Sequence, residues 1–94
     1  MSVLVIGADD ILTIKNTLSP VGVEKFYHID GRRNSDTKKE IPCDTHCVIL
    51  LTNFINHNAM KVFKKQAKAK NIPLICSKKN VNCIFAEYCK LFKE

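Results

Sequence analysis

"HCVILLTNFINHN", residues 46–58, is the stretch of this sequence that decides the fold. Its apolar run, Val48 to Leu51, suits a strand that is covered on both faces, as the strands of parallel sheets are. The polar residues 52–56 then lead into a segment with helical spacing of its apolar residues. A buried strand followed directly by a helix is typical of a parallel sheet whose strands are joined by crossover helices. The stretch therefore predicts an α/β fold.

The residues before this stretch show the same alternation of strands and helices. SVLVI, residues 2–6, predicts a short buried strand, and Asp9 or Asp10 is expected to cap the helix that follows it. Ser19-Pro20 should end this helix, because proline cannot continue the helical hydrogen-bond pattern. EKFYHID, residues 24–30, is rich in aromatic and β-branched residues and predicts a second strand.

The remaining segments complete the pattern. The polar segment 31–44 predicts a long surface loop. A second helix should end at Asn71, residues 72–77 predict a fourth strand, and Asn80 is expected to cap a last helix. The residues expected on the buried faces of these two helices are Ala59, Met60, Phe63, Ala67, Val81, Ile84, Phe85, Tyr88 and Phe92. The sequence thus predicts a three-layer α/β fold with a four-stranded parallel sheet in the order 2-1-3-4, similar to half of a Rossmann or flavodoxin fold.

Composition limits the kind of protein this is. The 94 residues are 46% hydrophobic and 26% charged, as expected of one folded domain, residues 1–94. No apolar run reaches the length of a membrane span, so we expect a cytoplasmic protein that makes no membrane contact. Five cysteines is an odd number, and reduced thiols are expected rather than a disulfide framework. The net charge of +6 is compatible with an acidic partner and also with a solvated surface.

The expected topology locates a ligand site. In an open parallel sheet, ligands bind at the carboxyl ends of the strands. Polar or basic residues follow all four strands, in the segments 7–10, 31–34, 52–58 and 77–80. The segments expected at the opposite edge are less polar and less basic. We therefore expect the ligand at the carboxyl ends of the strands. The residues predicted to bind it are Asp9, Arg32, Arg33, Asn53, Asn56, His57, Lys78 and Lys79.

The asparagines and the histidine of TNFINHN are only partly explained by helix capping. Asn56 or Asn58 is a natural N-cap of the second helix, since an asparagine side chain accepts hydrogen bonds from the first N–H groups of a helix. Asn53 and His57 have no such explanation. His57 either faces a ligand or is an ordinary histidine of the first helical turn.

Several of these segments resemble one family. They are Gly7-Ala8-Asp9, His28-x-x-Gly31-Arg32, the stretch Leu51 to Asn58, and the pattern from Ala67-Lys68 through Ile72-Pro73 to Ser77. Together they resemble the small bacterial family catalogued as a domain of unknown function, DUF2325, over essentially the whole chain. The family implies no established activity. Histidine-mediated binding of haem or of a metal is the property that the resemblance suggests.

Haem or a transition metal is the first ligand hypothesis. The motif C-x-x-C-H is absent, so the haem would be non-covalent haem b, which needs one or two imidazoles, an apolar slot and cations for its propionates. His57 could supply one nitrogen and His28 another, the latter from a second subunit. His28 could instead be a strand histidine bonded to a neighbour. A sheet of four strands has exposed edges, which makes a homodimer compatible with this scheme.

A phosphate-bearing ligand or nucleic acid is the alternative hypothesis for the same edge. Its basic rim would consist of Arg32, Arg33, Lys38, Lys39, Lys78 and Lys79, with Tyr27 or Phe54 available for stacking. Gly7 alone does not make the glycine-rich turn of a dinucleotide site, and no P-loop is present. Thr52-Asn53 stand where a phosphorelay receiver needs an aspartate. No residue is assigned a catalytic role.

Overall fold

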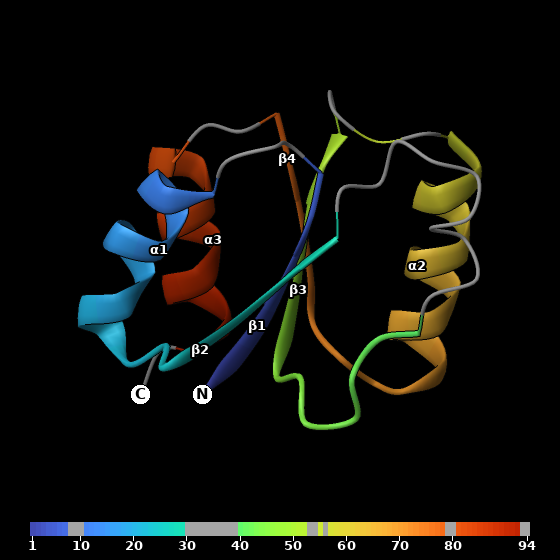
Figure 1. The fold of residues 1–94 in the computed structure, drawn as a ribbon, viewed down its shortest axis with the longest axis horizontal. Coiled ribbons are helices and arrows are strands. Elements are labelled where there is room, and N and C mark those ends of the chain that lie inside the picture. The colour runs from blue at the N-terminus through green and yellow to red at the C-terminus, as the bar shows by residue number, and fades with distance from the viewer. Residues whose placement is uncertain (8–10, 30–39, 53–54, 56, 79–80, 93–94) are drawn as a thin grey trace.

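The fold is a three-layer α/β sandwich, seen in a computed structural model that describes residues 1–7, 11–29, 40–52, 55, 57–78 and 81–92 (Figure 1). The elements in chain order are β1 (Ser2–Ile6), α1 (Leu12–Leu18), the 3-10 helix η1 (Ser19–Val21), β2 (Lys25–Ile29), β3 (Cys47–Leu51), α2 (His57–Ala69), β4 (Leu74–Ser77) and α3 (Val81–Leu91). The predicted elements are confirmed in type and order, and the strands are shorter than predicted by one or two residues at some ends.

The four strands form one parallel sheet in the order β2-β1-β3-β4, as the sequence predicts. In the register, Val5 is the partner of His28 in β2 and of Ile49 in β3, and Ile49 is the partner of Ile75 in β4. Every residue of the central strands β1 and β3 is buried, which is why both read as continuous apolar runs.

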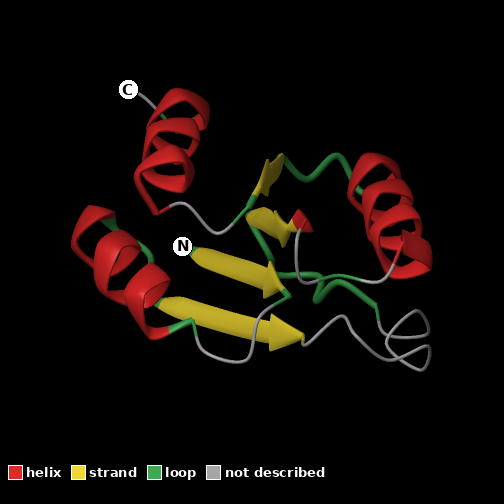
Figure 2. Cartoon of the chain, turned by 90° about the horizontal axis from the view of Figure 1, so that it is seen from above, coloured by secondary structure: helices red, strands yellow, loops and turns green. Residues whose placement is uncertain are grey.

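The helices cover both faces of the sheet. Figures 1 and 2 show α1 and α3 side by side on one face and α2 alone on the other. The buried residues between the sheet and the helix pair are Val3, Val5, Ile11, Ile14, Leu18, Val23, Cys47, Ile49, Leu51, Ile75, Ile84 and Tyr88. Those between the sheet and α2 are Leu4, Ile6, Ile29, Ile41, Val48, Leu50, Ala59, Phe63 and Ala67. Each buried strand residue thus packs on the helix layer toward which the pleat directs it.

Helix α1 begins later than predicted, and it ends at Leu18, before Ser19-Pro20, as the sequence predicts. Its N-cap is Ile11, which makes no side-chain capping bond, so the predicted cap by Asp9 or Asp10 is wrong. Asp9 and Asp10 themselves lie outside the described residues. At its other end the chain continues past Ser19 as η1, because proline fits the first position of a helix. Gly22, with a φ of 104°, then turns the chain toward β2.

Helix α2 ends where the sequence predicts. Asn71 has a φ of 56°, and its N–H donates to the Lys68 carbonyl at 3.2 Å while the Ile72 N–H donates to the Ala67 carbonyl at 2.9 Å. This pair of bonds is a Schellman motif, which satisfies the last carbonyls of the helix. At the start of the helix, Asn58 is the second helical residue and is not the N-cap.

Helix α3 buries less of its surface than expected. Ile84 and Tyr88 are buried, but Phe85 is 38% exposed, so its predicted burial is wrong. The reason is angular: Phe85 lies about 100° around the helix from Ile84, at about 3.6 residues per turn, and the buried face is narrower than that. Among the described residues, no helix combines the length and the apolar character that a membrane crossing requires.

Candidate functional site

The carboxyl ends of β1 and β3 lie side by side at the topological switch point of the sheet. From β1 the chain continues to β2 on one side, whereas β3 pairs with β1 on the other side. Gly7 follows β1 there with a φ of 111°, and its N–H donates to the Ile29 carbonyl at 2.8 Å. A Cβ on Gly7 would lie 3.0 Å from Leu51 Cβ and 3.1 Å from Ile55 Cγ1. Glycine at this position lets the backbone of β1 approach β3 closely, and Ile55 covers the junction.

His28 lies at the same edge but is already engaged. Its Nε2 is 3.0 Å from the Gly7 carbonyl oxygen. A carbonyl oxygen only accepts hydrogen bonds, so Nε2 carries the hydrogen in this contact. This bond ties β2 to the end of β1 and confirms the interpretation of His28 as a strand histidine bonded to a neighbour. His28 is exposed.

His57 and Lys78 are the predicted ligand residues that the described structure brings to this edge. His57 is the first residue of α2 and is exposed, and Lys78 is exposed directly after β4. Between them, the Thr52 hydroxyl donates to the Ser77 carbonyl at 3.3 Å and joins the ends of β3 and β4. The other predicted site residues, which are Asp9, Arg32, Arg33, Asn53, Asn56 and Lys79, lie outside the described residues.

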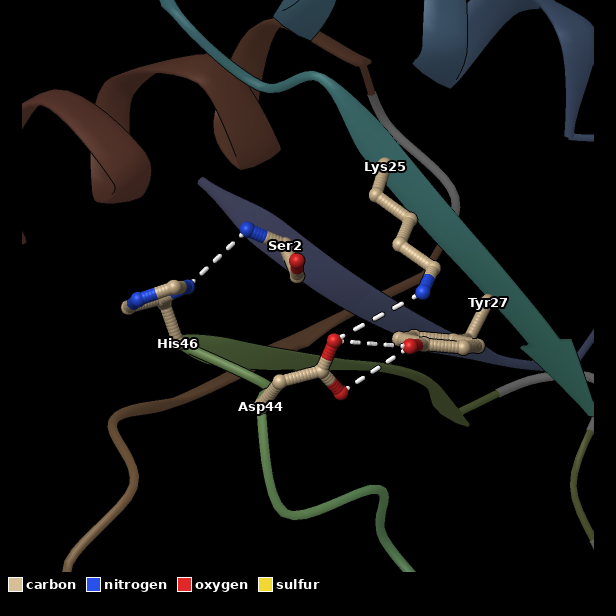
Figure 3. A network of polar contacts seen from close by, with 5 residues as sticks. All are labelled: Ser2, Lys25, Tyr27, Asp44 and His46. Atoms are coloured by element: carbon tan, nitrogen blue, oxygen red, sulfur yellow. Dashed lines mark hydrogen bonds and ion pairs between the residues drawn. The ribbon is translucent and has the colours of Figure 1, made fainter.

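The opposite edge of the sheet is more polar than the sequence suggests (Figure 3). The Tyr27 hydroxyl lies 2.9 Å from both carboxylate oxygens of Asp44, and Lys25 Nζ lies 3.6 Å from Asp44 Oδ2. The backbone N–H of Ser2 donates to Nδ1 of His46 at 3.0 Å. These bonds fix the turn before β3 to β1 and β2. Sequence reasoning missed them because they join residues that are 17 to 44 positions apart.

This network predicts how Asp44 titrates. The Tyr27 hydrogen bond and the nearby Lys25 ammonium hold the pKa of Asp44 below its usual value, while the Tyr27 contact and Asp44 raise the pKa of Lys25. The Asp44 contribution to stability should therefore be present above the unfolded-state pKa and be lost as the pH falls through the folded-state pKa. In Tyr27→Phe, NMR titration should show the Asp44 pKa moving back up. An unchanged pKa in this variant would contradict the role of the hydroxyl.

Two hollows open on the described surface. One, of about 520 Å³, is at the amino-terminal edge, and its lining is Cys43, Thr45, His46, Lys70, Asn71, Ile72 and Pro73. The other, of about 450 Å³, runs along β4 and α3, and its lining is Leu74, Ile75, Cys76, Ser77, Lys78, Cys83 and Glu87. The second hollow reaches the candidate site through Ser77 and Lys78. The alternation of side chains along an edge strand is the sequence signal that could have located it.

The cysteines differ in environment. Cys47 is buried in β3, and burial raises the pKa of its thiol to about 12, which makes it unreactive at neutral pH. Cys43, Cys76, Cys83 and Cys89 are exposed, and none of them forms a disulfide. Within the described ranges, no three histidine, cysteine or acidic side chains are grouped so as to hold a metal ion.

Fold and site define a small doubly wound α/β domain with a candidate ligand-binding edge at the carboxyl ends of its strands. Residues 2–90 match the model of the family described as "Uncharacterized protein conserved in bacteria (DUF2325)", and the chain belongs to this family. It has no significant match among curated proteins or among solved structures.

Proposed function

We propose that this protein is a small cytoplasmic ligand-binding domain with a regulatory role, which binds haem at the carboxyl edge of its sheet through His57. The observation that carries the proposal is the position of His57. Its imidazole is exposed on the first residue of α2, at the edge where parallel α/β sheets bind their ligands. The imidazole has no hydrogen-bond partner in the part of the chain that the structure describes.

Haem fits this edge better than a bare transition metal does. A protein-bound metal ion needs about three or four side-chain ligands, and the described residues offer no such group. The porphyrin supplies four nitrogens itself, so haem requires only one or two from the protein. A bare metal would need ligands from outside the described residues or from a second copy of the chain.

The cations that haem needs for its propionates have candidates on the same edge. Lys78 is an exposed cation beside the end of β3, and Arg32, Arg33 and Lys79 are assigned to the propionates from the sequence alone. His28 is the weaker axial candidate, because its Nε2 is held by the Gly7 carbonyl and only Nδ1, the ring nitrogen nearer the backbone, could then reach a metal. A second nitrogen would then come from the His57 of a second copy, and this arrangement would make the haem-bound protein a homodimer.

Haemin titration tests this assignment, because the chain contains only three histidines. The wild-type protein should give a sharp Soret shift, and His57→Ala should abolish it because the axial nitrogen is lost. His46→Ala is the matched control, since His46 lies at the opposite edge and is bonded to the Ser2 backbone. Its Soret shift should persist.

The outcomes are distinguishable once circular dichroism shows that each variant is folded. A Soret shift that survives in His57→Ala would reject His57 as the ligand. A shift that is lost in His28→Ala but not in His57→Ala would transfer the role to His28. If haemin does not bind at all, a phosphate-bearing or nucleic-acid ligand on the basic rim of the same edge becomes the better assignment, and Lys78→Ala should weaken its binding.

A further inference from the structure

The charge of this protein is concentrated in one part of the chain. Residues 45–86 contain no aspartate or glutamate, and their lysines are Lys61, Lys64, Lys65, Lys68, Lys70, Lys78 and Lys79. The net charge of the whole chain is +6, so the rest of the sequence is close to neutral. An uneven distribution of this kind creates a local positive potential rather than a uniformly solvated surface.

Four of these lysines form a stripe along the outer side of α2. Lys61, Lys64, Lys65 and Lys68 are all exposed, and they recur at the spacings i, i+3, i+4 and i+7 that place residues on one helix face. The opposite side of the helix, with Phe63 at its centre, is buried against the sheet. The stripe spans about 10 Å, at about 1.5 Å of rise per residue. Figure 1 shows α2 as the one labelled helix on its side of the sheet.

Most of this lysine stripe is unfavourable to the helix itself, although Lys68, in the last turn, interacts favourably with the helix dipole. Like charges at i, i+3 and i, i+4 repel one another, and α2 contains no acidic residue to offset them. The ion pairs recorded among the described residues, Lys25–Asp44 and Lys90–Glu87, lie elsewhere. Ammonium groups in a row, with no ion pair recorded to any described residue, form a surface complementary to a row of anions.

We propose that the lysine stripe of α2 binds the phosphodiester backbone of double-stranded nucleic acid. Ammonium groups bind phosphates as point charges and release the counterions that surround a duplex. Contacts of this kind would be independent of base sequence, because phosphates carry no sequence information directly. They use a different surface from the haem edge and do not depend on His57.

Two features of α2 favour a duplex over other polyanions. Single-strand binding relies on stacking of bases on aromatic side chains, and the only aromatic residue of α2, Phe63, is fully buried. Membrane binding by an amphipathic helix needs an apolar face that can enter the lipid, and the apolar face of α2 is in the core. The large hydrophobic residues that are exposed, among them Leu12 and Phe85, belong to other elements.

A matched pair of variants tests the stripe. Lys64→Gln/Lys68→Gln removes two charges from α2, and Lys15→Gln/Lys90→Gln removes two charges from the opposite helix layer. Both variants have the same net charge. Glutamine is a good helix former, so neither variant should lose stability in thermal unfolding. Binding is measured with a fluorescent DNA duplex and an RNA duplex over a series of salt concentrations.

The expected result is a change in salt dependence for the α2 variant alone. Four lysine–phosphate contacts on B-DNA give a slope of log K against log salt of about −3.6, which is about a 150-fold loss of affinity between 50 and 200 mM salt. Lys64→Gln/Lys68→Gln should reduce this slope by about 1.8, and the control variant should leave it unchanged.

Three results would overturn the proposal. They are the absence of duplex binding by the wild type at 50 mM salt, equal slopes for the two variants, and tighter binding to phosphatidylserine vesicles than to the duplex. Equal slopes would show that only net charge matters. Vesicle preference would assign the stripe to an anionic lipid surface.

Discussion

Phe63→Ala should destabilise the protein by about 3–5 kcal/mol, a large part of the roughly 5–15 kcal/mol that holds a small domain folded. Phe63 is fully buried in α2 and is the largest of the fully buried side chains. Its buried neighbours on the same helix, Ala59 and Ala67, offer only methyl groups to the sheet. Loss of the ring would therefore remove the largest fully buried side chain between α2 and the strands, and would leave a cavity there.

Urea unfolding measures this effect. The midpoint should fall by about 2 M if the slope m is about 2 kcal/mol per M, and m should stay the same. Lys64→Ala, one residue away on the outer side of α2, is the control and should change stability by no more than about 0.5 kcal/mol. A loss below about 1.5 kcal/mol for Phe63→Ala would mean that α2 is held to the sheet by something other than this ring.

The strand order could be predicted from the sequence because each central strand is apolar on both faces. Residues 48–51 have no polar position that could face water, so a helix layer had to cover each side. The end of α2 could also be predicted, since asparagine readily adopts the left-handed conformation that ends a helix, as Asn71 does. The first residue of α1 could not be predicted from the sequence. Two aspartates are good caps in isolation, but the packing of Ile11 and Ile14 on the sheet places the first turn later.

The edge of the sheet that carries the candidate site could be predicted from the sequence, but the hydrogen bonds at the two edges could not. Parallel topology determines which segments reach the carboxyl edge, and this placed His57 and Lys78 there. The contact of His28 with the Gly7 carbonyl depends on the register of β1 and β2, which composition does not specify. The Tyr27–Asp44 bond was missed for the same reason, because it joins a strand to a turn that arrives from a separate part of the chain.

Gly7→Ala should cost about 2–5 kcal/mol, and comparison with Gly22→Ala separates the two causes. Both glycines have left-handed backbone angles, with φ of 111° and 104°. An alanine at either position pays about 1–2 kcal/mol for this conformation. A Cβ at Gly22 would meet nothing within 4 Å, whereas at Gly7 it would lie 3.1 Å from the Leu51 carbonyl oxygen and about as close to Ile55. Only Gly7→Ala therefore adds about 1–3 kcal/mol of overpacking.

The same pair of variants tests where the proposed haem binds. The Leu51 backbone cannot yield without moving the end of β3, so Gly7→Ala should displace the segment that leads to His57. Gly22 lies at the opposite edge, near the amino-terminal residue, whose amino group is 3.4 Å from the Gly22 carbonyl. Haemin affinity, measured below the unfolding transition, should fall in Gly7→Ala and stay at the wild-type level in Gly22→Ala. Equal affinities in the two variants would place the ligand away from the junction of β1 and β3. A ligand bound at that junction would lose affinity when the backbone there is displaced.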